Sequence, residues 1–229
     1  MVIISSNVHV LEMLEPDFFG TVLNHNITFI ENGYKNGLVM IDTGLPGNIE
    51  IISNFLKKIK YSINDISYIF ITHYHPDHTG NVNAIKEISK AKVIANENEK
   101  EKLLNESLFN INYDDVKSTI NVNKEDFYKT TARIDNIRRG RINADIYLKT
   151  EETFDNIKVI NSPGHTKGHI SILYNNILIA GDAINNTDGI RPPFMFFCDD
   201  YAGAINSFNK LINIKSKMII PFHGEIIKN

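Results

Sequence analysis

A dense run of metal-ligand side chains follows one apolar segment and limits the folds that this chain can adopt. The segment Phe70–Asn81 reads FITHYHPDHTGN and holds three of the 8 histidines, together with an aspartate. In extended backbone, side chains two positions apart face the same way, so His73 and His75 can reach one ion. Asp77 and His78 follow a proline and point elsewhere, toward a second ion nearby. Imidazole and carboxylate groups are costly to bury together unless a cation binds them, so this segment predicts a metal site.

Three more candidate ligands stand in similar positions, after an apolar run and beside a glycine. They are His165 in NSPGHTKGH, Asp182 in ILIAGD and His223 in MIIPFHG. Strand ends at one edge of a layered domain converge in space, so the four segments can build a single site. Imidazole and carboxylate ligands suit zinc, and iron and manganese also accept them.

The pattern of apolar runs predicts a layered α/β or α+β domain. Runs rich in Ile, Val and Phe, bounded by Gly, Asn, Asp or Pro, predict strands at 2–5, 26–31, 37–42, 67–72, 91–95, 156–162, 169–174, 176–182 and 217–221. Apolar residues spaced three and four apart predict helices at 48–60, 80–90 and 200–212. An Asn-Asn pair between two of these strands predicts a two-residue hairpin turn.

The segment 97–150 has weaker strand character and more charge than the rest. We interpret it as a mostly helical insertion within a single domain that covers residues 1–229. One reading makes it a lid that offers cations to an anionic substrate, and another makes it a solvated helix face. Its arginines are Arg133, Arg138, Arg139 and Arg141. A third reading is an exchange of apolar helix faces between subunits, which leaves a homodimer open.

Composition narrows the range of partners. The chain has 229 residues with a formal charge of −3, which gives no basic footprint for nucleic acid or an anionic membrane. No stretch approaches the roughly 18 apolar residues of a membrane helix. A single cysteine, Cys198, excludes an intramolecular disulfide and fits the cytoplasm, and we expect it to be an ordinary buried thiol. The N-terminus lacks the features of a signal peptide. These observations favour a cytoplasmic protein with a small-molecule substrate.

With these motifs in their order, the chain resembles the metallo-β-lactamase superfamily. The resemblance rests on HYHPDH, GHTKGH, GD and FHG, preceded by VMIDTG, and it extends from Val39 to Gly224. It implies an α+β fold, a four-layer αββα sandwich with two divalent ions, zinc by preference, between the edges of two sheets. By that pattern one ion is held by His73, His75 and His165, the other by Asp77, His78 and His223, and Asp182 bridges both.

The resemblance also implies a reaction. Two ions that share a water lower its pKa, and the resulting hydroxide would attack an ester, thioester or lactone carbonyl. Asp77 would also act in catalysis, by orienting that water or carrying a proton. The glyoxalase II and lactonase branches resemble the chain most. The main alternative is a mononuclear iron enzyme similar to persulfide dioxygenases. A flavin-partnered di-iron oxidoreductase and a non-catalytic metal-binding module are further alternatives.

Several residues outside the ligand pattern have two readings. Asp42 either supports the ligand loop or belongs to an ordinary turn, and His169 either supports the site or is a core histidine. The apolar stretch 189–201 would wall a pocket for an acyl or ring group, or simply fill the core. The pocket residues predicted from it are Phe194, Met195, Phe196 and Phe197. His9 and His25 are expected to be structural or exposed.

Overall fold

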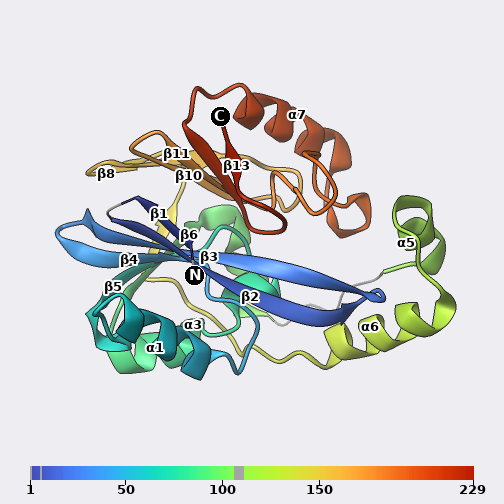
Figure 1. Cartoon of the computed structure of the whole chain (residues 1–229), viewed down its shortest axis with the longest axis horizontal. Helices are drawn as coiled ribbons and strands as arrows, with labels where there is room; N and C mark the ends of the chain where they lie inside the picture. Colours follow the sequence, from blue (N-terminus) through green and yellow to red (C-terminus); the bar gives the residue numbers. More distant parts are fainter. Residues whose placement is uncertain (1, 6, 106–110) are drawn as a thin grey trace.

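Two β-sheets lie face to face in the computed structural model, which describes residues 2–5, 7–105 and 111–229 (Figure 1). The first sheet runs in the order β1 (Val2–Ser5), β2 (Val8–Phe18), β3 (Thr21–Tyr34), β4 (Gly37–Ile41), β5 (Ile66–Phe70), β6 (Lys92–Asn96), β7 (Ile146–Leu148). The second runs in the order β13 (Ile227–Lys228), β12 (Met218–Pro221), β11 (Ile177–Gly181), β10 (Ile170–Tyr174), β9 (Ile157–Asn161), β8 (Thr153–Phe154).

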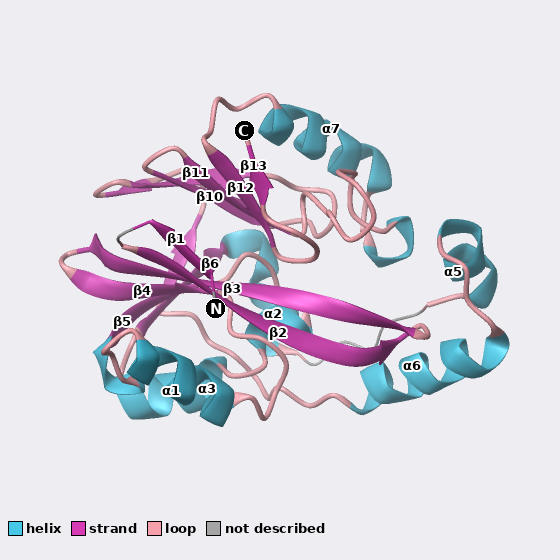
Figure 2. Cartoon of the chain, viewed as in Figure 1, coloured by secondary structure: helices cyan, strands magenta, loops and turns pink. Residues whose placement is uncertain are grey.

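Helices cover the outer faces of the two sheets (Figure 2). Helices α1 (Ile49–Lys58) and α3 (Val82–Ser89) lie on the first sheet, and α7 (Tyr201–Ile212) lies on the second. A short helix, α2 (Pro76–Thr79), follows β5, and α4 (Lys100–Leu104), α5 (Tyr113–Thr119) and α6 (Lys124–Asn136) follow β6. Short 3-10 turns are η1 (Ile63–Asp65), η2 (Glu97–Glu99) and η3 (Met195–Phe197). The predicted αββα sandwich is confirmed. Among the described residues, no helix is long and apolar enough to cross a membrane.

The two-residue period of the strands explains the layers. In β4, Leu38 and Met40 face helices α1 and α3, whereas Val39 and Ile41 face the second sheet. Strand β11 likewise divides its side chains between the inter-sheet core and α7. Because successive side chains of a strand point to opposite faces, fully apolar strands such as these are buried on both sides.

The N-terminal hairpin was missed by sequence reasoning. No strand was predicted at 8–18, and the strand predicted at 26–31 in fact covers Thr21–Tyr34. Strand β2 interrupts its apolar residues with Glu12, Glu15 and Pro16, so it lacks the continuous run that marks the other strands. The two strands pair antiparallel and extend beyond the sheet toward α6 (Figure 1).

The hairpin predicted at the Asn-Asn pair is confirmed. Tyr174 pairs with Ile177 across the turn, and both Asn175 and Asn176 have positive φ, as a type I′ turn requires.

In the segment 97–150, the described residues form helices α4, α5 and α6, and then β7, which pairs with β6 in the sheet. Residues 106–110 of that segment lie outside the described residues. The reading of this segment as an insertion in one domain stays a prediction.

Strand direction explains why the predicted ligands meet. Strands β4, β5 and β6 run parallel, and in the other sheet β11 and β12 run parallel. The loops after β5, β9, β11 and β12 therefore open toward a common region between the sheets.

Candidate metal centre

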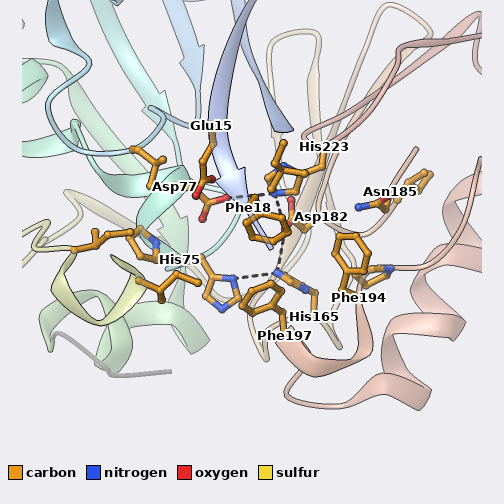
Figure 3. A pocket seen from close by; sticks show the side chains of 17 residues that line it. Glu15, Phe18, His75, Asp77, His165, Asp182, Asn185, Phe194, Phe197 and His223 are labelled. Carbon is orange, nitrogen blue, oxygen red and sulfur yellow. Dashed lines mark hydrogen bonds and ion pairs between the residues drawn. The ribbon is translucent and has the colours of Figure 1, made fainter. Parts of the chain in front are cut away.

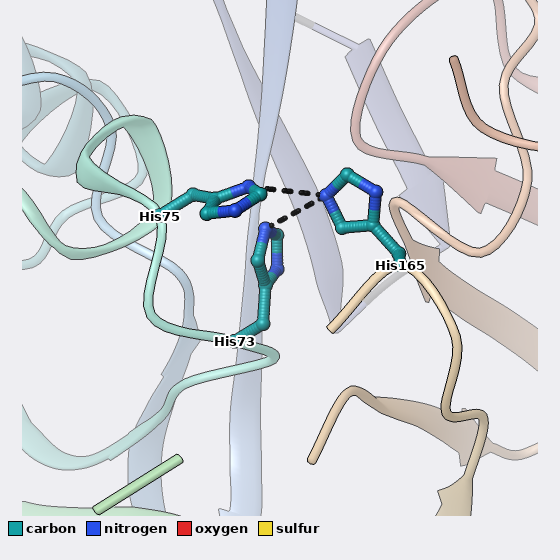
Figure 4. A group of neighbouring side chains, drawn as sticks. All are labelled: His73, His75 and His165. Carbon is teal, nitrogen blue, oxygen red and sulfur yellow. Dashed lines mark hydrogen bonds between the residues drawn. The ribbon is translucent and has the colours of Figure 1, made fainter. Parts of the chain in front are cut away.

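Three imidazoles from two loops converge on one point (Figure 4). His165 Nε2 lies 3.2 Å from His73 Nε2 and 3.1 Å from His75 Nδ1. All three rings are buried, and burial lowers the pKa of His73 and His75 well below the ordinary value. Tetrahedral zinc with Zn–N bonds of about 2.0–2.1 Å separates two ligand nitrogens by about 3.3 Å. The spacing of the three rings and the lowered pKa of His73 and His75 therefore fit a metal ion.

A second group of ligand atoms lies beside the first, around two carboxylates. His78 Nε2 lies 3.5 Å from Asp77 Oδ2 and 3.2 Å from Asp182 Oδ1. His223 Nε2 lies 3.3 Å from Asp77 Oδ2 and 3.5 Å from Asp182 Oδ2. The same Asp182 Oδ2 lies 3.2 Å from His165 Nε2, so this carboxylate faces both groups. The structure thus brings together all seven side chains of the predicted ligand set.

Two atoms in this cluster test the fit to a cation. His78 Nε2 and Asp182 Oδ1 are buried and have no hydrogen-bond partner among the residues that the structure describes. Burial would raise the pKa of Asp182, but His223, His78 and His165 outweigh it and hold that pKa well below its ordinary value. Burial lowers the pKa of His223, yet Asp182 and Asp77 raise it to about 10. Buried, unpaired polar atoms around two ionised carboxylates are the chemistry of a divalent metal site.

Asp42 orients the ligand loop, as one of its two readings predicted. Its carboxylate accepts hydrogen bonds from the Thr72 backbone N–H at 2.8 Å and the Thr72 hydroxyl at 2.7 Å. His78 Nδ1 donates to the same carboxylate at 2.8 Å, which leaves Nε2 free to face the centre. A carboxylate behind a ligating histidine fixes its tautomer and raises its basicity.

His169 supports the bridging aspartate. Its Nε2 accepts the backbone N–H of Asp182 at 3.0 Å, and its Nδ1 lies 2.9 Å from the Ser162 hydroxyl. Burial lowers the pKa of His169 to about 3, so the ring is neutral and can accept that bond. The ring therefore fixes the backbone of Asp182 without itself facing the ions.

Glu99, from turn η2, joins the two loops that carry the three imidazoles. Its carboxylate accepts the backbone N–H groups of Tyr74 at 2.8 Å and Gly168 at 2.6 Å, and the Thr166 hydroxyl at 2.9 Å. The residue is 1% exposed, and burial raises the pKa of its carboxyl group. Sequence reasoning missed it, because only its burial and long-range partners distinguish it from the other acidic residues of NENEKE.

A pocket that is partly open to solvent leads to the cluster (Figure 3). His75, Asp77, His165, Asp182 and His223 form its polar floor. Its walls are mainly apolar and come from the hairpin, the loop after β4, the segment after β6 and the segment after β11. These wall residues are Phe18, Leu23, Leu45, Ile134, Ile137, Ile184, Pro193, Phe194 and Phe197.

Two of the four predicted pocket residues line this pocket. Phe194 and Phe197 do so, whereas Phe196 packs edge-on against Phe19 and Met195 is 42% exposed. The cause is the 3-10 turn η3, which points successive side chains in different directions.

Cys198 follows this turn, with Sγ 3.8 Å from His165 Nδ1, and burial raises its pKa to about 12.

Three of the four arginines of the segment 97–150 bind protein groups, and none of the four lines the pocket. Arg133 pairs with Glu15, while Arg138 and Arg139 donate to backbone carbonyls. The residues that this segment contributes to the pocket wall are the apolar Ile134 and Ile137. The geometry therefore does not favour the reading of this segment as a lid that offers cations to the substrate.

Comparison with known proteins identifies the family. The model of the metallo-beta-lactamase superfamily matches residues 20–223, which include every ligand described above. The chain belongs to this superfamily. It is 30% identical to a probable metallo-hydrolase of Methanocaldococcus jannaschii, MJ0888, over 85% of each chain. It is 27% identical to the metallo-beta-lactamase fold-containing protein ST1585 of Sulfurisphaera tokodaii, over 82% of this chain and 69% of that one.

Solved structures of the superfamily share the fold. The metallo-beta-lactamase family protein TTHA1429 of Thermus thermophilus matches 99% of this chain and 76% of its own, with a TM-score of 0.71 and 17% identity.

More distant relatives by sequence include an N-acyl homoserine lactonase of Bacillus, 23% identical over 84% of this chain and 78% of its own. A hydroxyacylglutathione hydrolase of Idiomarina loihiensis is 25% identical over 77% of this chain and 50% of its own.

Proposed function

We propose that this superfamily member is a hydrolase with two divalent metal ions, zinc by preference, acting on an ester, thioester or lactone with an uncharged apolar substituent. The observation that carries the proposal is the double set of ligand atoms that meet at Asp182, on the floor of an apolar pocket. The lactonase and hydroxyacylglutathione hydrolase relatives act on bonds of this kind by name, which supports the bond class.

The wall of the pocket supports an uncharged substituent. None of the lining residues, within the part of the chain that the structure describes, is Lys or Arg. Against this wall an anionic substituent would lose its hydration without gaining a cationic side chain, whereas an acyl chain or ring gains from burial. The substrate is thus a small molecule, and nucleic acid or membrane partners are not part of the proposal. A cytoplasmic location and a homodimer remain predictions.

The residues divide the work of hydrolysis. When bound, two divalent ions supply an activated water and polarise the carbonyl oxygen. Asp77 lines the pocket with a side chain that is 20% exposed, so it can accept a hydrogen bond from the attacking water and take its proton. The water oxygen bonds to the carbonyl carbon, the bond to the leaving oxygen or sulfur breaks, and that atom receives the proton. Asp42 and His169 keep the ligands in place throughout.

The test combines elemental analysis with a panel of lactones, esters and thioesters that differ in acyl length. We expect two ions per chain, turnover that improves with acyl length, and loss of at least one ion together with most turnover in Asp182→Ala. The control Asp188→Asn changes an exposed aspartate six residues away and should retain both properties. One iron per chain with oxygen uptake on persulfides would instead support the dioxygenase alternative. Bound metal without turnover on the whole panel would support a non-catalytic module.

A further inference from the structure

The hairpin β2–β3 brings two ionisable side chains into the metal centre that no ligand motif includes. His25 is 1% exposed and Glu15 is 6% exposed, and both sit on the part of the hairpin next to the cluster. Glu15 lines the same pocket as Asp77 (Figure 3). His25 was expected to be structural or exposed, and the structure places it in the interior beside candidate ligands.

His25 lies within reach of the second group of ligands. Each of His25, Asp77 and His223 offers one possible ligand atom, and these three atoms lie within 4.8 Å of one another. The His25 ring stacks on Phe222 at 5.3 Å and meets the His223 ring edge-on at 5.1 Å. Tetrahedral zinc holds its donors about 3.3 Å apart, so the widest separation in this group would have to close by up to about 1.5 Å for all three atoms to bind one ion.

One nitrogen of His25 lacks the partner that burial demands. His25 Nε2 is buried and has no hydrogen-bond partner in the described part of the chain. Glu15 Oε2 lies 3.0 Å away, but not in the direction of a hydrogen bond. A buried imidazole nitrogen that has only this poorly directed contact with a carboxylate gains from a nearby cation or its bound water.

The other oxygen of Glu15 is held from outside the centre. Arg133 of helix α6 lies with Nη2 2.5 Å from Glu15 Oε1, and it also donates to the Pro16 carbonyl at 2.6 Å. This pairing balances the buried charge of Glu15 and fixes the hairpin against α6. The hairpin therefore reaches the metal centre as a rigid wall, with Glu15 and His25 on its inner face.

We propose that His25 is a further donor to the ion held by Asp77 and His223, with its ring packed on Phe222. The inference rests on the two-metal centre proposed above and adds to it a ligand from the N-terminal hairpin. Imidazole nitrogen is a common donor for zinc, and iron and manganese accept it as well.

The chain contains a matched control on the same sheet. His9 of β2 is also buried, and its Nε2 lies 2.7 Å from Glu31 Oε1 in a hydrogen bond. It belongs neither to the metal-ligating groups nor to the pocket lining. His9→Gln therefore removes a buried, carboxylate-paired imidazole without touching the centre.

The experiment measures zinc affinity of the whole chain by competition with a chromophoric chelator. We expect His25→Gln to weaken binding of one zinc equivalent by about tenfold or more and to leave the other within about twofold. His9→Gln should bind both equivalents as the parent does. Unchanged affinities for both equivalents in His25→Gln would overturn the proposal and make His25 a packing residue.

A measurement on the unmodified protein covers the case in which the variant does not fold. In protein labelled with ¹⁵N-histidine, zinc titration should shift a ring nitrogen of His25 with one of the two equivalents and leave that of His9 in place. A His25 resonance that does not move would reject the proposal. Because neither readout uses turnover, a protein that binds zinc through His25 but hydrolyses nothing would refute the proposed function and leave this inference standing.

Discussion

At the scale of single residues, the ligands depend on groups that touch no ion. His78 is held through Nδ1 by the carboxylate of Asp42. His223 is held through Nδ1, which lies 2.9 Å from the backbone carbonyl of Asn24. Asp182 is held through its backbone N–H by His169. Partners of this kind fix the ring tautomer and the direction of the donor atom. Their removal should therefore change metal affinity before it changes the fold.

Glu99 provides the sharpest residue-scale prediction. Glu99→Gln replaces one acceptor oxygen with an NH₂ group that faces backbone N–H or hydroxyl donors, so at least one of the three loop contacts is lost. We expect affinity for the ion at the three imidazoles to fall by about 10–100-fold, measured by chelator competition. Glu97→Gln, an exposed neighbour on the same turn, is the control. Equal affinities in the two variants would show that Glu99 does not position the loops.

At the scale of elements, helix α6 and the hairpin form one side of the substrate pocket. Thr130 accepts the Phe19 backbone N–H at 2.8 Å, and Arg133 pairs with Glu15. Ile134 and Ile137 follow directly and face the pocket. The position of this wall depends on contacts between segments that are more than a hundred residues apart.

Arg133→Met should loosen that wall. We expect the KM for substrates with long acyl chains to rise several-fold, while the KM for short ones changes little. The pairing itself contributes only about 1 kcal/mol or less, since the guanidinium is partly exposed. Steady-state kinetics over a series of acyl lengths measures the effect, and Arg138→Met, which loses only bonds to nearby carbonyls, is the control. A uniform change across all lengths would contradict this role.

Asp145 links strand β6 to helix α3 and makes stability depend on pH. Burial raises the pKa of Asp145, but the hydrogen bonds from Lys86 and the Val93 N–H outweigh it and lower that pKa. A carboxyl group with a depressed pKa stabilises the fold above its unfolded pKa of about 3.9, and this contribution is lost as pH falls through the folded pKa. Asp145→Asn should therefore lower the free energy of unfolding at pH 7, by about 1 kcal/mol or less, and have little effect near pH 2. Urea unfolding at both values tests this, and an equal loss at both would contradict it.

At the scale of the whole molecule, the centre joins the two halves of the sandwich. Asp77 comes from the loop after β5 in the first sheet, and Asp182 and His223 come from loops after strands of the second. Bound ions would tie these loops together in the folded state only. Binding to the folded state alone adds about 4 kcal/mol of stability at a free ion concentration a thousand times the Kd.

Removal of metal should therefore lower the melting temperature. For a chain of this size each kcal/mol corresponds to roughly 2–4 °C, so dialysis against a chelator should lower the Tm by roughly 8–16 °C. Returning zinc should restore it, and calorimetry measures both steps. Chelator-treated and zinc-loaded protein with the same Tm would contradict coupling between the centre and the sandwich.

The sequence by itself determined the layers and the candidate ligands, because both follow from local order. Strands such as Gly37–Ile41 and Ile177–Gly181 are apolar throughout, and each predicted ligand lies in the segment that follows a strand. Only the tertiary structure decided the roles of Glu15, His25 and Glu99. Strand β2 lacks a continuous apolar run, and its cross-strand register places Glu15 and His25 at the centre. Glu99 reaches Gly168 across 69 positions, a contact that no local pattern contains and that only packing of the two sheets brings about.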